Sequence, residues 1–307
     1  MQLPPKFWFQ LERLKKALRS TFGTSGQNYD SSHRMCPNCR ALVERNASVC
    51  PFCGEKLRSP RARSTPGAPG RILGVIPIPS TATSAIVAVT MALYGISWYM
   101  TATSASAQGA PAMGDISGEV LLRLGAKSPY ILMGQWWRLV TAIFLHAGLF
   151  HIGMNLWCLF DLGPQVESLF STAKFMVFYL VTGVAGFLLS LWWSPFGISV
   201  GASGSILGLI GILIGASFHH GHLGREYRRQ LWRWVIYIAI FGVFFRIDNA
   251  AHFGGLVTGV LLGYVVPEGE AETRASQNLW NVLAVLSVVI IAGSFALMAL
   301  QLGQPLH

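Results

Sequence analysis

Hydrophobic residues are distributed unevenly along this chain. Residues 1–75 are polar and basic, whereas the sequence from Ala82 onward is rich in apolar residues. A membrane-spanning helix needs roughly 20 predominantly apolar residues. The pattern predicts spans at 82–100, 149–168, 174–193, 202–218, 231–247, 250–266 and 279–301. Several are short or contain polar groups, which indicates helices packed against protein, and no stretch of 101–148 is long enough to span.

The composition supports an integral membrane protein. The 307 residues are 52% hydrophobic and 12% charged, whereas soluble domains carry about 25% charged residues. We therefore predict an all-α polytopic membrane protein. Its expected regions are a basic amphipathic segment (1–30), a metal-binding unit (33–57), a Pro/Arg/Ser-rich linker (58–81), a helical core (82–268) and a linker with an extra transmembrane helix (269–307).

The first twenty residues combine aromatic and leucine positions with lysines and arginines. This pattern predicts a basic amphipathic helix rather than a signal peptide, and it fits a solvated tail equally well. The net charge of +10 is concentrated in the polar N-terminal region, which favours contact with anionic lipid headgroups. A nucleic-acid-binding role is not favoured, because no recognition helix or aromatic interleaving accompanies the charge.

Two CPxC motifs, at 36–39 and 50–53, precede the membrane region and predict a structural zinc site. Each tight turn presents two thiolates, and four thiolates complete a tetrahedral zinc site with no open position for catalysis. The expected ligands are Cys36, Cys39, Cys50 and Cys53. The alternative is a pair of disulfides, which a reducing cytosol disfavours. Cys158 lies in an apolar span and is expected in the core, and the sequence does not identify a partner for this unit.

Basic residues predict the orientation in the membrane. With seven spans, the N-terminal region, Lys174 and the arginines at 225, 228, 229 and 233 fall on one side, with the arginines in or beside a loop. The positive-inside rule places that side, and the N-terminus, in the cytoplasm. Ser203 and His252 then both begin helices at the opposite, extracytoplasmic face.

Glycines follow these two polar residues at helical spacing. They are Gly204, Gly208, Gly211 and Gly215 after Ser203, and Gly255, Gly259 and Gly263 after His252. Small residues let membrane helices approach backbone to backbone. Two such faces packed together would bring Ser203 and His252 within hydrogen-bonding reach. The alternative is that the glycines only pack helices and the polar residues are incidental.

His151 and Asn155 are four residues apart and therefore share one helix face at the same membrane depth. A serine nucleophile creates an oxyanion that needs preorganised donors, such as an Asn amide, a His N–H and a helix N-terminus. The G-x-S-x-G elbow is absent, since Ser205 takes the place of its second glycine. Asp248 precedes the His252 helix and is expected to cap it, so a Ser203–His252 dyad fits better than a triad.

Together these residues resemble the rhomboid intramembrane serine proteases. The resemblance covers about 82–268, with its motifs in the right order and spacing. The matching features are Trp137-Arg138, His146, the HxxxN of His151 and Asn155, the GxSG from Gly201 to Gly204, the AHxGGxxxG that includes Gly255 and Gly259, and the GPQVE stretch at 163–167.

The resemblance implies a six-helix rhomboid core, followed here by a seventh C-terminal helix and preceded by a small zinc ribbon. It implies that Ser203 is the nucleophile and His252 the general base. His151, Asn155 and the Ser203 backbone N–H would form the oxyanion hole. Arg138 would hold the loop 101–148, which would be partly sunk in the outer leaflet. Trp137, His146, Gly201, Gly204, Gly255 and Gly259 would be structural or loop residues.

The resemblance also implies the partners and the location. The substrates would be single-pass transmembrane proteins in the lipid bilayer, unwound near the outer leaflet and cleaved beside small residues. The expected location is a bacterial inner membrane, with the active site opening to the extracytoplasmic side. The alternatives are an inactive rhomboid-like protein that binds membrane clients, and a transporter. The absence of internal repeats in the sequence disfavours a transporter.

Overall fold

The computed structural model describes residues 33–35, 42–44, 47–54, 71–72, 76–77, 80–104, 114–244, 247–269 and 273–302. The chain divides into two compact units. One comprises Met1–Ala68 and Leu73–Val75, and the other comprises Pro69–Ile72 and Ile76–His307. The predicted segment 1–30 lies outside the described residues.

The first unit contains an antiparallel hairpin. Strand β1 (His33–Met35) pairs with β2 (Leu42–Glu44), with His33 opposite Glu44. Val43 of β2 and Cys50 are buried together. Cys36 and Cys39 lie outside the described residues, so the expected zinc ligands are described only in part.

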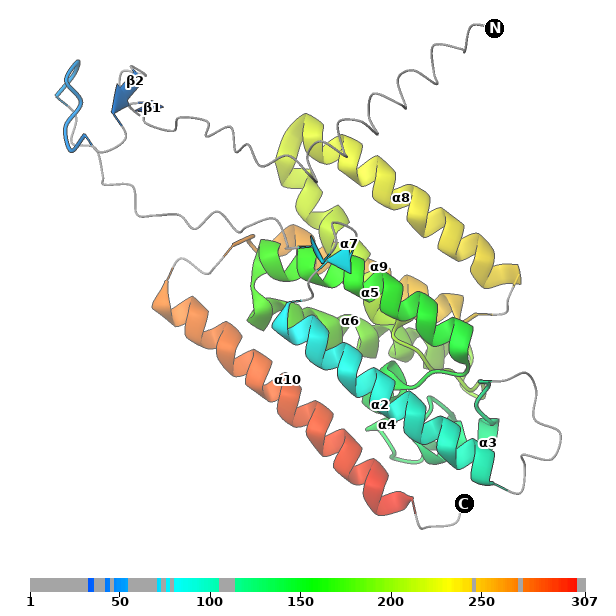
Figure 1. The fold of residues 1–307 in the computed structure, drawn as a ribbon. Coiled ribbons are helices and arrows are strands. Elements are labelled where there is room, and N and C mark those ends of the chain that lie inside the picture. Colours follow the sequence, from blue (N-terminus) through cyan, green and yellow to red (C-terminus); the bar gives the residue numbers. More distant parts are fainter. Residues whose placement is uncertain are drawn as a thin grey trace, which may run out of the picture. The chain divides into compact units, whose positions relative to one another are not determined.

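The described part of the second unit consists mainly of helices, with one short antiparallel pair, β3 (Arg71–Ile72) and β4 (Ile76–Pro77). Figure 1 shows its helices along the chain. They are α2 (Thr81–Thr103), α3 (Gly118–Arg123), η2 (Pro129–Ile131), α4 (Arg138–Thr141), η3 (Ala142–Phe144), α5 (Leu149–Phe170), α6 (Thr172–Trp193), α7 (Ser203–Ala216), η4 (Ser217–His220), α8 (Gly221–Phe244), α9 (Asn249–Val265) and α10 (Arg274–Gln301).

Each predicted span coincides with one of these helices, but the helices differ in whether they are long and apolar enough to cross a membrane. Among the described residues, four are long and apolar enough to cross a membrane: α2, α6, α7 with η4, and α10. There is a fifth candidate span if Arg138–Phe144 and Leu149–Phe170, which meet at 90°, form one bent span. Helix α9 has only 17 residues. Helix α8 starts at Gly221 instead of 231, so the arginines at 225–233 lie on a helix and not in the expected loop.

Side-chain caps explain where several helices begin. The side chain of Ser117 accepts a hydrogen bond from Val120 N at the start of α3. At the start of α10, the side chain of Thr273 accepts one from Ser276 N. Asp248 caps α9 by accepting from Ala251 N at 3.0 Å, as the sequence predicted. These contacts satisfy backbone N–H groups that have no partner within the helix.

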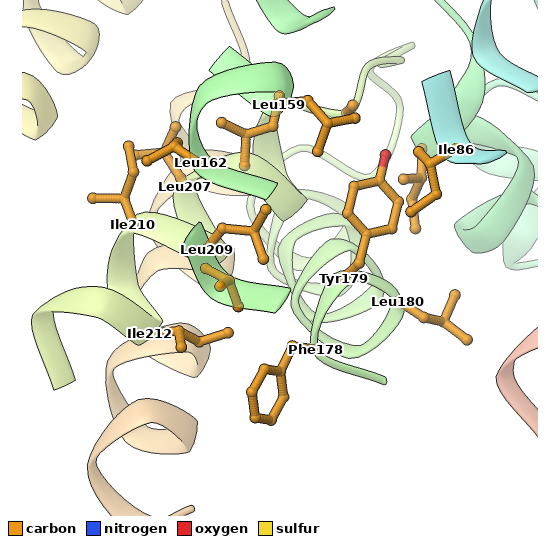
Figure 2. Close-up of a cluster of buried hydrophobic side chains, with 14 of the residues drawn as sticks. Ile86, Leu159, Leu162, Phe178, Tyr179, Leu180, Leu207, Leu209, Ile210 and Ile212 are labelled. Atoms are coloured by element: carbon orange, nitrogen blue, oxygen red, sulfur yellow. The ribbon is translucent and has the colours of Figure 1, made fainter. Parts of the chain in front are cut away.

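The core of the helical unit is built mainly by α2, α5, α6 and α7. Figure 2 shows Ile86 of α2, Leu159 of α5, Tyr179 of α6 and Leu209 of α7 meeting in one cluster. Every residue of α7 after Ser203 is buried. Because it is buried on all sides, α7 is the central helix of this unit and contacts protein rather than lipid.

Helices α7 and α9 approach each other backbone to backbone, so the expected contact between their glycine faces is confirmed. A Cβ atom on Gly255 would lie 2.0 Å from Gly204 O, and one on Gly259 would lie 2.0 Å from Gly208 O. A Cβ on Gly263 would lie 2.1 Å from Ile212 O. These distances leave no room for any side chain other than hydrogen at the glycine positions.

Two buried charged residues connect helix ends. The Glu167 carboxylate of α5 accepts hydrogen bonds from Ser80 Oγ, from Thr83 N at 2.8 Å and from Thr83 Oγ1 at 2.7 Å. The Lys174 ammonium of α6 donates to Pro267 O at 2.7 Å and to Gly269 O at 2.9 Å, just beyond α9. Each buried charge therefore has several hydrogen-bond partners, which lowers the cost of removing it from water.

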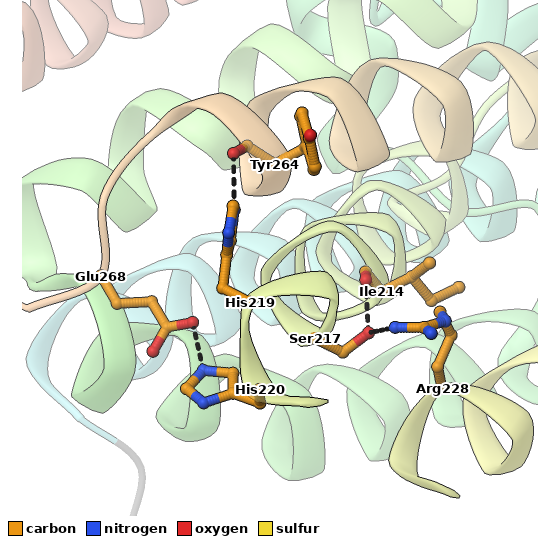
Figure 3. A network of polar contacts seen from close by, with 7 residues as sticks. All are labelled: Ile214, Ser217, His219, His220, Arg228, Tyr264 and Glu268. Atoms are coloured by element: carbon orange, nitrogen blue, oxygen red, sulfur yellow. Dashed lines mark hydrogen bonds and ion pairs between the residues drawn. The ribbon is translucent and has the colours of Figure 1, made fainter. Parts of the chain in front are cut away.

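A polar network joins the ends of α7, α8 and α9 that lie away from Ser203 and His252 (Figure 3). His219 Nε2 lies 2.9 Å from Tyr264 O, and His220 Nε2 lies 2.6 Å from Glu268 Oε1. Arg228 of α8 donates to Ser217 Oγ at 3.0 Å. The helix pair α7–α9 is thus held together at this end as well as along its glycine faces.

The glycine contact makes a testable prediction for stability. Gly259→Ala would push a methyl group into the Gly208 carbonyl, so the helices must separate. We expect a loss of about 1–3 kcal/mol in unfolding free energy, the usual cost of overpacking. Thermal unfolding in detergent micelles, followed by circular dichroism, measures the change.

Gly293→Ala in α10 is the matched control, because a Cβ there meets nothing within 4 Å. Alanine is favoured over glycine inside a helix by about 0.5–1 kcal/mol, so this variant should be unchanged or slightly more stable. Equal melting temperatures for the two variants would contradict the close contact of α7 and α9.

Candidate active site

Ser203 is the first residue of α7 and is half-buried. The backbone reaches it through Gly201, whose φ of 131° is rarely adopted by residues with a side chain. Gly201 N donates to Ala142 O at 2.9 Å. A Cβ at Gly201 would lie 2.8 Å from His151 Nε2 and 3.8 Å from Ser203 Oγ. Glycine at 201 therefore lets the loop pass directly beside the His151 ring.

His252 lies in the first turn of α9, directly beside Ser203. Its Nε2 atom is 2.7 Å from Ser203 Oγ, a distance typical of a hydrogen bond. The imidazole is 7% exposed, and its Nδ1 atom has no partner among the described residues. Asp248 does not serve as that partner: its carboxylate accepts from Ala251 N and from Ser190 Oγ.

The close approach of α7 and α9 explains the short distance between Ser203 and His252. Each residue is at or near the N-terminal end of its helix, and the first glycine contact, Gly204 with Gly255, lies one to three residues further on. With a larger residue at Gly255 the helix axes would separate, and a serine side chain is too short to span the gap.

His146, His151 and Asn155 gather next to this pair at the start of α5. The rings of His146 and His151 lie 4.9 Å apart in an edge-on arrangement. Asn155 is buried, and its Nδ2 donates to His151 O at 2.9 Å. An amide nitrogen carries two N–H groups, so this bond uses one of the two donors of Asn155. The structure thus brings five predicted site residues into one region: His146, His151, Asn155, Ser203 and His252.

Trp137 and Arg138 lie in the preceding loop and shape it. The Arg138 guanidinium is buried and donates to Leu122 O at 2.6 Å, to Ala126 O at 3.3 Å and to Gln135 Oε1 at 2.6 Å. It also stacks over the Trp137 ring, 4.7 Å from the centroid. Arg138 therefore closes the segment 122–138 on itself, and its hydrogen bonds to described residues go to this segment, not to Ser203 or His252.

Lys127 also belongs to this region, although it was not among the residues predicted from the sequence. It is 1% exposed, and its ammonium donates to the carbonyls of Ser194 and Gly197 in the loop that leads to Ser203. The available signal was a single lysine in an apolar stretch beside the membrane, where an ionisable side chain is costly and needs a specific partner.

The three cysteines among the described residues lie in two places. Cys50 is buried and Cys53 is exposed in the turn of the first unit, while Cys158 is half-buried in α5 and packs against the helical core. Within the described ranges, no group of three or more His, Cys, Asp or Glu residues is arranged to hold a metal ion. Since Cys36 and Cys39 are outside those ranges, the four-cysteine site remains a prediction.

Comparisons with known proteins show what this arrangement is similar to. The profile of the Rhomboid domain family matches residues 133–269. Rhomboid protease GluP of Bacillus subtilis (strain 168) is 35% identical over 152 residues, which cover 48% of this chain and 29% of GluP. RHOMBOID-like protein 6, mitochondrial, of Arabidopsis thaliana is 35% identical over 155 residues, which cover 49% of this chain and 50% of that protein.

A third relative is matched over more of its length. Putative rhomboid protease YdcA of Bacillus subtilis (strain 168) is 33% identical over 139 residues, which cover 43% of this chain and 68% of YdcA. The matches to GluP and RHOMBOID-like protein 6 span no more than half of those proteins. The matched family domain contains all five residues of the cluster around Ser203 and His252. The chain is an integral membrane protein that belongs to the rhomboid family.

Proposed function

We propose that this chain is an intramembrane serine endopeptidase that cleaves transmembrane segments with Ser203 as nucleophile and His252 as base. The observation that carries the proposal is the 2.7 Å separation of Ser203 Oγ and His252 Nε2. A serine hydroxyl becomes a useful nucleophile when a base lies within hydrogen-bond distance. Two relatives named as rhomboid proteases support the same reaction class.

In the first half of the reaction, Ser203 Oγ attacks the carbonyl carbon of the scissile peptide bond. His252 Nε2 takes the hydroxyl proton as the Oγ–carbon bond forms. The resulting tetrahedral intermediate collapses when the carbon–nitrogen bond breaks, and His252 gives the proton to the leaving amine. The acyl group remains on Ser203.

The developing oxyanion needs hydrogen-bond donors at that moment. We assign this role to the second N–H of the Asn155 amide, a ring N–H of His151 and the backbone N–H of Ser203. The N-terminus of α7 adds the favourable end of its helix dipole. In related sites the loss of one such donor lowers kcat by about 10²–10³-fold.

Water completes the reaction by attacking the acyl carbon. His252 now removes a proton from that water and returns it to Ser203 Oγ as the ester bond breaks. Ser203 is only half-buried at the end of its helix, which is compatible with access for water. A site at the bilayer centre would lack this access, so placement at the helix ends suits hydrolysis.

We further propose that substrates are single-pass membrane proteins cleaved near the extracytoplasmic face of a bacterial inner membrane. The arginine-bearing start of α8 lies at the end of α7 opposite Ser203. By the positive-inside rule that end faces the cytoplasm, and Ser203 faces the other side. The alternative, an inactive client-binding relative, is disfavoured because Ser203 and His252 are both present and in contact.

Replacement of Ser203 tests its role as the nucleophile. Purified protein in proteoliposomes should cleave a synthetic transmembrane substrate, and Ser203→Ala should lower cleavage by at least about 10³-fold, as loss of a catalytic serine does elsewhere. A fluorophosphonate probe should label the wild type and fail to label Ser203→Ala, as measured by mass spectrometry of the labelled peptide.

Ser205→Ala supplies the matched control on the same helix. Ser205 is buried and donates to Tyr179 O at 2.8 Å, so it has a structural partner and no contact with His252. This variant should keep both cleavage and labelling. Unchanged cleavage in Ser203→Ala would exclude the dyad, and a wild type that neither cleaves nor labels would favour the inactive alternative.

We also propose that Cys36, Cys39, Cys50 and Cys53 hold one structural zinc ion. Two features of the described residues support this fit. The β1–β2 hairpin brackets the first motif, and Gly54 N donates to Cys50 O at 2.9 Å across the second, with Gly54 at φ 73°. Such a tight turn suits two thiolates that bind one ion. Zinc would stabilise a unit too small to fold through its own core.

The zinc proposal predicts one zinc ion per chain in metal analysis by mass spectrometry. Cys50→Ser should lower the zinc content at least tenfold, whereas Cys158→Ser, in the helical unit, should leave it unchanged. Alkylation under denaturing, non-reducing conditions with a chelator should modify all four cysteines. Protection of these cysteines as two disulfides would refute the metal site.

A further inference from the structure

Lys127 joins two loops of the helical unit through both its side chain and its backbone. Its ammonium donates to Ser194 O and, at 3.1 Å, to Gly197 O. Its backbone N and O pair with Ser199 O and N, each at 3.0 Å. One residue therefore makes four hydrogen bonds to the stretch 194–199, and this isolated antiparallel bridge fixes the register of the two segments.

The stretch held by Lys127 leads directly to the nucleophile. Only Val200, Gly201 and Ala202 separate Ser199 from Ser203. Gly201 N is bonded to Ala142 O, so the loop has a second attachment close to the active site. With both ends of this short segment bonded, the position of Ser203 relative to the start of α5 is tightly constrained.

The charge of Lys127 also acts toward the helix that carries His252. Burial lowers the pKa of the Lys127 ammonium, and the Asp248 carboxylate opposes this change by attraction. Asp248 in turn caps α9 and accepts a hydrogen bond from Ser190 Oγ at the end of α6. The Lys127 ammonium thus donates hydrogen bonds to the loop before Ser203 and attracts the carboxylate of Asp248, the residue that caps α9.

We propose that Lys127 is a positioning residue that holds the stretch 194–199 against the loop 101–148, so that Ser203 Oγ stays aligned with His252 and the oxyanion donors. This inference rests on the proposed protease function. A displacement of the reacting groups by about 1 Å can cost 10²-fold in rate. Loss of the ammonium leaves the Ser194 and Gly197 carbonyls without their buried donor, which frees the loop to move.

Lys127→Met tests this role, because methionine has similar length without the charge or donors. We expect kcat in proteoliposomes to fall about 10–100-fold with KM unchanged, the pattern of an interaction needed in the transition state. Lys127→Arg retains charge and donors and should recover part of the rate, although the guanidinium geometry differs.

Lys174→Met is the matched control. Lys174 is also buried and donates to two backbone carbonyls, but these follow α9 at the end away from Ser203. It should lower the melting temperature to a similar degree while leaving kcat, assayed well below that temperature, near the wild-type value. An equal loss of kcat in both lysine variants, or none in Lys127→Met, would overturn the positioning role.

Hydrogen–deuterium exchange separates this inference from the proposed function. The amides of Ser199 and Gly201 should exchange faster in Lys127→Met than in the wild type or Lys174→Met. Unchanged exchange at these amides, in a wild type that cleaves substrate, would show that Lys127 does not hold the loop. A wild type without cleavage would refute the protease function whatever the exchange result.

Discussion

The backbone contact between α7 and α9 is the constraint on which the rest of this structure depends. Hydrogen is the only side chain that fits at Gly255, which meets the Gly204 carbonyl, and at Gly259, which meets the Gly208 carbonyl. In a bilayer, apolar surface gains little by leaving lipid for protein, so packing and hydrogen bonding must hold helices together. Two helices without intervening side chains maximise that packing. The same closeness lets a short serine side chain reach an imidazole on the neighbouring helix.

Polar contacts hold this helix pair in place at both ends. Near Ser203 and His252, the buried Lys127 ammonium bonds the loop before Ser203, and Asp248 accepts from Ser190 at the end of α6. At the other end, the partly exposed pair of His220 and Glu268 joins the turn after α7 to the residues after α9. In an apolar environment a polar group without a partner is costly, so the buried contacts near Ser203 and His252 select one arrangement of the loops.

Sequence patterns predicted much of this arrangement. All seven apolar segments became helices, and the glycine spacing correctly indicated the face of α9 that meets α7. On α7 it was correct for Gly211 and Gly215, whereas Gly208 faces Thr182 of α6. Asp248 was correctly predicted as a cap. The start of α8 was predicted ten residues too late, at 231 instead of Gly221. Arginines lower the mean hydropathy of a segment, yet they are good helix formers. Hydropathy locates the apolar part of a helix and does not detect a polar extension of it.

Spacing along the chain determined which residues share a helix face and which polar side chains lie at the same depth. It grouped Ser203, His252, His151 and Asn155 because helical periodicity and helix ends are local properties. Only the tertiary structure decided the 2.7 Å contact of Ser203 with His252 and the bonds from Lys127 to the loop before Ser203. Those contacts join segments distant in sequence, and their geometry depends on loop paths for which local periodicity carries no information.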